Sequence, residues 1–147
     1  MREIKFRAWD GYKIHYPVNF EFGISGVSGK TSIAFVPFGS LGYTTTSHIM
    51  QYTGLKDKNG VEIYEGDIII IEDVYKDIIL DDGTGPSEPF NHLAPVAFKQ
   101  AEYGVDIKDG ADIFCSGFWS FQSIRYETGQ DDYEVIGNIC ENPELLK

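Results

Sequence analysis

Short segments rich in β-branched and aromatic residues recur along the whole chain, separated by Gly, Pro, Asn and Asp. Residues 3–9 alternate, with Ile4, Phe6 and Ala8 on one side, as a half-buried strand requires. The isoleucine run 68–71 does not alternate, and this predicts a strand covered on both faces. Many short strands with frequent turn signals are typical of antiparallel sheets. The sequence therefore predicts a mainly β fold, an antiparallel small barrel or sandwich.

The turn signals place further elements. Asn59-Gly60 follows the extended segment 48–54 and predicts a hairpin. Residues 142–146 alone predict helix, a short C-terminal turn with Asn142 as its cap and Pro143 at its first position. Residues 12–22 predict two short strands or one bent edge strand around Pro17. The other predicted strands are 31–38, 93–98, 102–107, 112–115 and 118–121.

The length of 147 residues suits one domain, and we expect residues 1–147 to form it. The segment 81–92 begins with Asp, Gly, Pro and Ser residues and predicts a mobile surface loop.

No stretch is as long and apolar as a membrane-spanning helix requires, so no membrane partner is expected. Cys115 and Cys140 form no CxxC pair or dense framework, which favours reduced thiols in the cytoplasm.

The net charge of −11 is spread unevenly. Residues 1–61 carry a net charge of +3, and residues 62–147 carry −14. A surface of that sign repels phosphate, so direct binding of nucleic acid is not expected. It attracts basic partners, although carboxylates also serve simply to keep a domain soluble.

Three patterns resemble chemical motifs. Gly23 to Thr31 imitates a phosphate-binding loop, but position 24, where the motif requires Gly, is Ile, and an extended run follows. Asp57-Lys58-Asn59-Gly60 imitates a calcium loop without its first and last ligands, so a hairpin turn explains it better. The histidines and cysteines lack metal or catalytic spacing, and we expect no catalytic residue, metal or cofactor. The scattered carboxylates, which serve an enzyme only if they converge, are Asp67, Glu72, Asp73, Asp77, Asp106, Asp109 and Asp112.

Aromatic residues suggest a surface for a partner. Tryptophan and tyrosine are enriched in interface hot spots, although most aromatic residues of small β domains belong to the core. The aromatic residues of this kind are Trp9, Tyr52, Tyr64, Trp119 and Tyr126. The candidate interaction surface comprises Trp9, Tyr52, Tyr64, Trp119, Asp77, Asp81 and Asp82.

Four segments carry a resemblance to a known family. Residues 50–69 read MQYTGLKDKNGVEIYEGDII, and the others are 2–10, 133–139 and 141–146. Together they resemble the YopX-like family of phage and prophage proteins, over a little under a third of the chain. The resemblance implies a mostly β protein in the cytoplasm of an infected or lysogenic bacterium, and it transfers no catalytic residue. Cys140 stands where an aromatic residue is more usual, and any specialised activity is expected in residues 11–49 and 73–132.

These observations predict a non-enzymatic accessory protein that binds an unknown host or phage protein or assembles with itself. The charges of opposite sign in residues 1–61 and 62–147 are compatible with a homo-oligomer, but they can equally meet within one monomer. The alternatives are a metal-dependent, hydrolase-like enzyme that uses converged carboxylates, and an acidic mimic of nucleic acid that binds a basic host protein.

Overall fold

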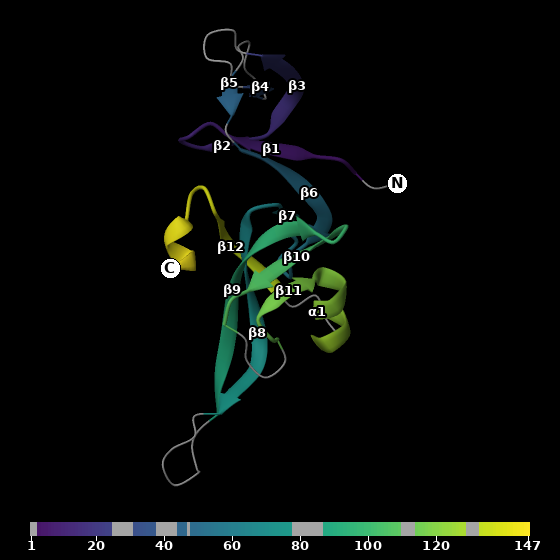
Figure 1. The fold of residues 1–147 in the computed structure, drawn as a ribbon, viewed down its shortest axis with the longest axis vertical. Helices are drawn as coiled ribbons and strands as arrows, with labels where there is room; N and C mark the ends of the chain where they lie inside the picture. Colours follow the sequence, from purple (N-terminus) through teal and green to yellow (C-terminus); the bar gives the residue numbers. More distant parts are fainter. Residues whose placement is uncertain are drawn as a thin grey trace. The chain divides into compact units, whose positions relative to one another are not determined.

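The computed structural model describes residues 3–24, 31–37, 44–46, 48–77, 87–109, 114–128 and 133–147. These residues form antiparallel strands with one short α-helix and a C-terminal 3-10 turn (Figure 1). The mainly β fold class is therefore confirmed. The chain divides into two compact units, Met1–Gly54 and Leu55–Lys147. That residues 1–147 make one domain stays a prediction.

The first unit contains two sets of paired strands. β1 (Phe6–Trp9) lies between β2 (Ile14–His15) and β6 (His48–Lys56), whose last two residues belong to the second unit. A second sheet has the order β3 (Pro17–Ile24), β4 (Thr31–Pro37) and β5 (Thr44–Thr46). The predicted strands around Pro17 are thus separate, and the segment after Thr31 is extended, as expected. Residues 25–30 of the loop-like motif lie outside the described residues.

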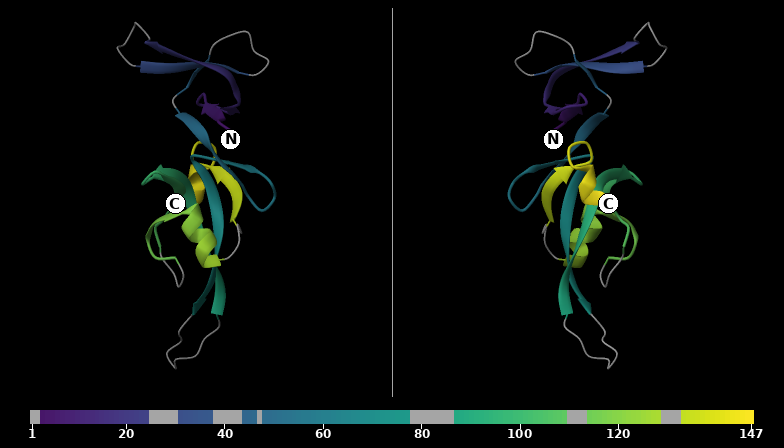
Figure 2. Two further views of the ribbon diagram at one scale, coloured as in Figure 1. Left: turned by 90° about the vertical axis from the view of Figure 1, so that its right-hand side faces the viewer. Right: turned by 90° about the vertical axis from the view of Figure 1, so that its left-hand side faces the viewer.

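The second unit is built on a five-stranded antiparallel sheet with the order β11-β10-β9-β8-β12. Its two longest strands, β8 and β9, lie side by side over most of their length (Figure 2). Figure 1 shows α1 and η1 on opposite sides of this sheet. The elements of the unit are β7 (Glu62–Tyr64), β8 (Asp67–Asp77), β9 (Ser87–Lys99), β10 (Glu102–Ile107), β11 (Gly117–Ser120), α1 (Phe121–Thr128), β12 (Tyr133–Asn138) and η1 (Pro143–Leu146).

Alternate residues of the sheet form the core beneath α1. Ile69 and Ile71 of β8 lie opposite Ala94 and His92 of β9, and all four side chains are buried. Phe121 and Ile124 of α1, one helical turn apart, close this face. Ile68 is also buried, so the isoleucine run is covered on both faces as predicted, except at the half-buried Ile70.

The predicted hairpin at Asn59-Gly60 is present, and one buried carboxylate anchors it. Asp57 is 6% exposed. Its Oδ1 accepts the backbone N–H groups of Asn59 (2.9 Å) and Val61 (2.8 Å), and its Oδ2 accepts that of Val135 in β12 (3.0 Å). The Tyr133 carbonyl, also in β12, accepts a hydrogen bond from the Lys58 N–H. Because β12 is an edge strand of the five-stranded sheet, these two bonds give partners to backbone groups that an edge strand otherwise leaves unpaired.

Several expectations need correction. Residues 121–128 form α1, which the sequence did not predict, so the strand expected at 118–121 ends at Ser120. Residues 87–92 of the predicted loop belong to β9 because they pair with β8, whereas 81–86 lie outside the described residues. Phe114 and Cys115 are not in a strand, and 112–113 are not described. Asn142 precedes η1, but its side chain makes no cap bond and instead accepts the N–H of Asn138 at 3.3 Å.

Candidate functional site

Two residues of the predicted interaction surface are buried in the structure. Tyr52 of β6 and Tyr64 of β7 are 5% and 1% exposed, so both are packed inside the fold and are not surface residues. Trp9 of β1 and Trp119 of β11 are half-buried. Asp77 ends β8, while Asp81 and Asp82 lie outside the described residues. An acidic surface that uses these three aspartates stays a prediction.

Three of the described carboxyl groups of the second unit are engaged in local contacts. Asp67 is buried and accepts the Tyr64 N–H at 2.7 Å. Asp73 lies 2.9 Å from Nε2 of His92, with both side chains buried. Asp106 forms an ion pair with Lys99. Within the described ranges, no three His, Cys, Asp or Glu side chains gather as a metal ion would require. None of the described helices has the length and apolarity needed to cross a membrane.

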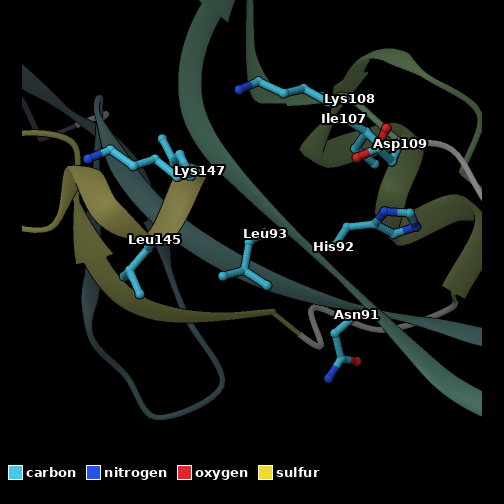
Figure 3. A pocket seen from close by; sticks show the side chains of 9 residues that line it. Asn91, His92, Leu93, Ile107, Lys108, Asp109, Leu145 and Lys147 are labelled. Carbon is cyan, nitrogen blue, oxygen red and sulfur yellow. The ribbon is translucent and has the colours of Figure 1, made fainter.

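One pocket lies over β9 beside the C-terminal turn. Its volume is about 400 Å³. Figure 3 shows Leu93 between Leu145 and Lys147 on one side and Lys108 and Asp109 on the other. Its lining contains charges of both signs, from Lys108, Lys147 and Asp109, around leucine side chains. We call it the η1 pocket.

A second pocket has a more uniform chemistry. It lies beside α1 and has a volume of about 390 Å³, within the range of small ligand sites. Two aromatic rings, two carboxylates and three neutral polar side chains line it. We call it the α1 pocket, and its residues are Glu102, Trp119, Ser120, Gln122, Ser123, Tyr126 and Glu127.

Local contacts hold the α1 pocket in shape. Ser120 precedes α1 and its Oγ accepts the Ser123 N–H at 3.1 Å, which is the bond of an N-terminal cap. Trp119 donates its indole N–H to the Cys115 carbonyl at 2.7 Å, and its ring meets Phe114 edge to face at 5.1 Å. Gly104 of β10 lets β11 approach, since a Cβ there would overlap the Trp119 carbonyl oxygen.

The carboxylates of the α1 pocket are not used by the fold. Glu102 and Glu127 are exposed, and neither side chain makes a hydrogen bond or ion pair with any part of the chain that the structure describes. Glu127 also lies in the last turn of α1, where the helix dipole already places negative charge. Tyr126 beside it is 85% exposed. The pocket therefore combines negative potential with aromatic surface that is open to a partner.

The sequence identified part of this site. Trp119 was expected on an interaction surface, and Tyr126 was recognised as a residue of hot-spot type. Glu102 was missed because it lies far from Tyr126 in sequence and is brought to α1 by the register of β10 with β11. Glu127, Gln122 and Ser123 lie in α1, and the sequence analysis did not identify them because it did not predict this helix. The available signal was Ser120, a helix-capping residue three positions before Ser123.

The fold and this pocket define a mainly β protein with an acidic, aromatic surface hollow. The chain belongs to the YopX family: the model of that family, described as YopX protein, matches residues 5–147. The chain is also similar to a solved structure, protein EF1440 from Enterococcus faecalis. The two share 30% sequence identity with a TM-score of 0.52, over 100% of each chain. A search of curated proteins found no match.

Proposed function

We propose that this chain is a phage or prophage accessory protein that binds a protein partner through the α1 pocket, without catalysing a reaction, in the cytoplasm of the bacterial host. The observation that carries the proposal is Tyr126, an aromatic side chain 85% exposed beside Trp119 in a preformed pocket. Tyr and Trp dominate the binding energy of protein interfaces. Tyr12 is as exposed as Tyr126, but only Tyr126 lines a pocket together with a second aromatic side chain.

The partner that this pocket favours is a different protein. In a symmetric dimer the same surface of each copy faces its equivalent. Two α1 pockets face to face would bring together both copies of Glu102 and Glu127, and like charges in one interface disfavour association. Self-assembly through another surface stays a prediction. We expect a monomeric mass by light scattering at micromolar concentration, and a dimeric mass that Tyr126→Ala abolishes would contradict the proposal.

Affinity capture tests the proposal with a matched pair of variants. The tagged protein is incubated with lysate of its bacterial host, half of it treated with nuclease, and retained proteins are quantified by mass spectrometry. Tyr12 is 91% exposed in the first unit and provides the control for Tyr126. We expect a stoichiometric partner that survives nuclease, is retained by Tyr12→Ala and is lost with Tyr126→Ala.

Two results would overturn this function. A partner retained equally by both variants would place the binding surface elsewhere. Retention that disappears with nuclease in the wild type would show that nucleic acid carries the interaction, against the expectation from the net charge of −14 over residues 62–147.

A further inference from the structure

We infer that the α1 pocket recognises a cationic side chain, the guanidinium of arginine or the ammonium of lysine, presented by the partner. This inference rests on the proposed function and names the chemistry of the contact. It follows from which charges the pocket contains, which of them the fold already uses, and how rigidly the aromatic rings are held.

The charge of the pocket has one sign. Glu102 enters from the start of β10 and Glu127 from the end of α1, and the lining that the structure describes includes no Lys or Arg. Lys99, directly across the β9–β10 hairpin from Glu102, pairs with Asp106 and lies 5.9 Å from the centre of the Phe118 ring. The nearest basic residue of α1, Arg125, does not line the pocket. An incoming cation therefore meets two carboxylates.

The aromatic lining suits the same ligand. A cation near the face of Trp or Tyr gains electrostatic attraction from the ring, and arginine is the residue that most often makes this contact. The Trp119 ring is fixed by its bond to the Cys115 carbonyl and its packing on Phe114, so little ordering is needed on binding. The C-terminal end of the α1 dipole adds attraction for positive charge beside Tyr126 and Glu127.

An anion is the opposing possibility because the N-terminal end of α1 also borders the pocket. Free N–H groups at a helix N-terminus attract anions. Here Ser120 Oγ already accepts the Ser123 N–H, and Ser123 Oγ lies 3.0 Å from Ser120 Oγ. With one of these N–H groups already bound by Ser120 and two carboxylates lining the pocket, the pocket repels a phosphate or carboxylate ligand.

The test uses short peptides and the two tryptophans of the chain. A hexapeptide with two arginines flanked by glycine and serine is titrated into the full protein, and the indole N–H signals of Trp9 and Trp119 are followed by NMR. Matched hexapeptides carry two glutamines or two glutamates instead. We expect a saturable shift of the Trp119 signal with the arginine peptide alone, while Trp9, in the first unit, stays unchanged. The shift should weaken as salt is raised from low ionic strength.

Charge variants separate the local site from the net charge of the protein. Glu102→Gln combined with Glu127→Gln should weaken arginine-peptide binding about tenfold. Glu72→Gln combined with Glu144→Gln removes the same charge from exposed positions outside the pocket and should change binding by less than about twofold.

The outcomes distinguish this inference from the function on which it rests. Equal shifts with the arginine and glutamine peptides, or unchanged binding in the Glu102→Gln, Glu127→Gln variant, would overturn the cationic contact. A Trp119 shift with the glutamate peptide alone would assign the pocket to anions. If the captured protein still depends on Tyr126 but not on Glu102 and Glu127, the protein-binding function holds and the cationic contact is wrong.

Discussion

Asp57 and Glu127 are both carboxylates of the second unit, but the fold uses them in opposite ways. Asp57 is 6% exposed and accepts three backbone N–H groups, one of them from β12. Glu127 is exposed at the end of α1 and accepts none from the described residues. The anchor residues Asp57, Asp67 and Asn138 behave alike, since each accepts backbone N–H groups through its side-chain oxygen.

This contrast separates folding chemistry from binding chemistry within one acidic unit. Burying a carboxylate costs free energy unless hydrogen bonds compensate for its lost hydration. A buried carboxylate with several hydrogen-bond donors is therefore part of the folded structure. An exposed carboxylate costs little and is available to a partner. The anchor residues all lie in segments 50–69 and 133–139, whereas Tyr126 and Glu127 lie outside these two segments. The match to the family model, residues 5–147, covers both the anchor residues and the α1 pocket.

The largest loss of stability is expected at the buried pair of Asp73 and His92. Their side chains are 0% and 4% exposed, and Oδ2 of Asp73 also lies 3.5 Å from the Phe114 nitrogen. His92→Leu removes one partner of the buried Asp73 side chain and should lower the free energy of unfolding by about 3–5 kcal/mol in urea denaturation. The double variant with Asp73→Leu should recover part of that loss. A single-variant loss below about 1 kcal/mol would contradict a compensated buried charge.

The next effect concerns the anchor Asp57. Asp57→Ala removes the acceptor of three backbone N–H groups and should lower the free energy of unfolding by about 3 kcal/mol. The neighbouring Lys58 supplies the control, because its ion pair with Glu134 at 2.9 Å is between side chains each 37% exposed. Lys58→Ala should cost less than about 0.5 kcal/mol. Similar losses at the two positions would remove the distinction between a carboxylate that binds backbone N–H groups, as Asp57 does, and one in a surface ion pair, as Glu134 is.

The carboxylates of the α1 pocket should matter for binding but not for stability. Glu102→Gln combined with Glu127→Gln, which weakens peptide binding, should change the free energy of unfolding by less than about 0.5 kcal/mol. Removing Glu127 also relieves its repulsion with the helix dipole, so a small gain in stability is the expected direction. Thermal and urea denaturation measure this. A loss above about 1 kcal/mol would mean that the fold depends on these carboxylates.

The strands were predictable where the local pattern and the tertiary packing agree. The isoleucine run and the Asn59-Gly60 turn each fix conformation locally, and Gly60 has the positive φ of 82° that such a turn requires. The alternation in residues 3–9 predicted a strand, of which Phe6–Trp9 is present, but the alternation of burial was wrong: Ile4 is 69% exposed, and Arg7 is buried like Ala8. Helix α1 was not predictable in the same way. Phe118 to Phe121 favours strand, and eight residues offer only Phe121 and Ile124 as a helical apolar pair. Packing of these two side chains on the sheet determines the helix.

The candidate site was predictable only one residue at a time. Trp119 and Tyr126 belong to residue types that favour interfaces, but residue type does not give exposure: Tyr64 is 1% exposed and Tyr126 is 85% exposed. The place of Glu102 depends on the β9–β10 turn and on the pairing of Gly104 with Ser120, which are set by non-local contacts. Sequence patterns specify strands and turns, whereas the pocket arises from strand register.

Asp10 tests whether hydrogen bonds from backbone N–H groups, without deep burial, are enough to lower the pKa of a carboxyl group. Its Oδ1 accepts the N–H groups of Lys13 (2.9 Å) and Tyr12 (2.8 Å), and its Oδ2 lies 2.6 Å from Nε2 of His15. The bond from Lys13, followed by those from His15 and Tyr12, lowers the pKa of Asp10 from 3.8 to about 2.

Because the pKa is lower in the folded chain, this carboxylate stabilises the fold above its ordinary pKa, and the contribution is lost as pH falls through about 2. Asp10→Asn should flatten the dependence of stability on pH over that range. An NMR titration of the Asp10 carboxyl should give a midpoint near 2. A midpoint at the ordinary value of 3.8 would show that these hydrogen bonds do not favour the charged form of Asp10.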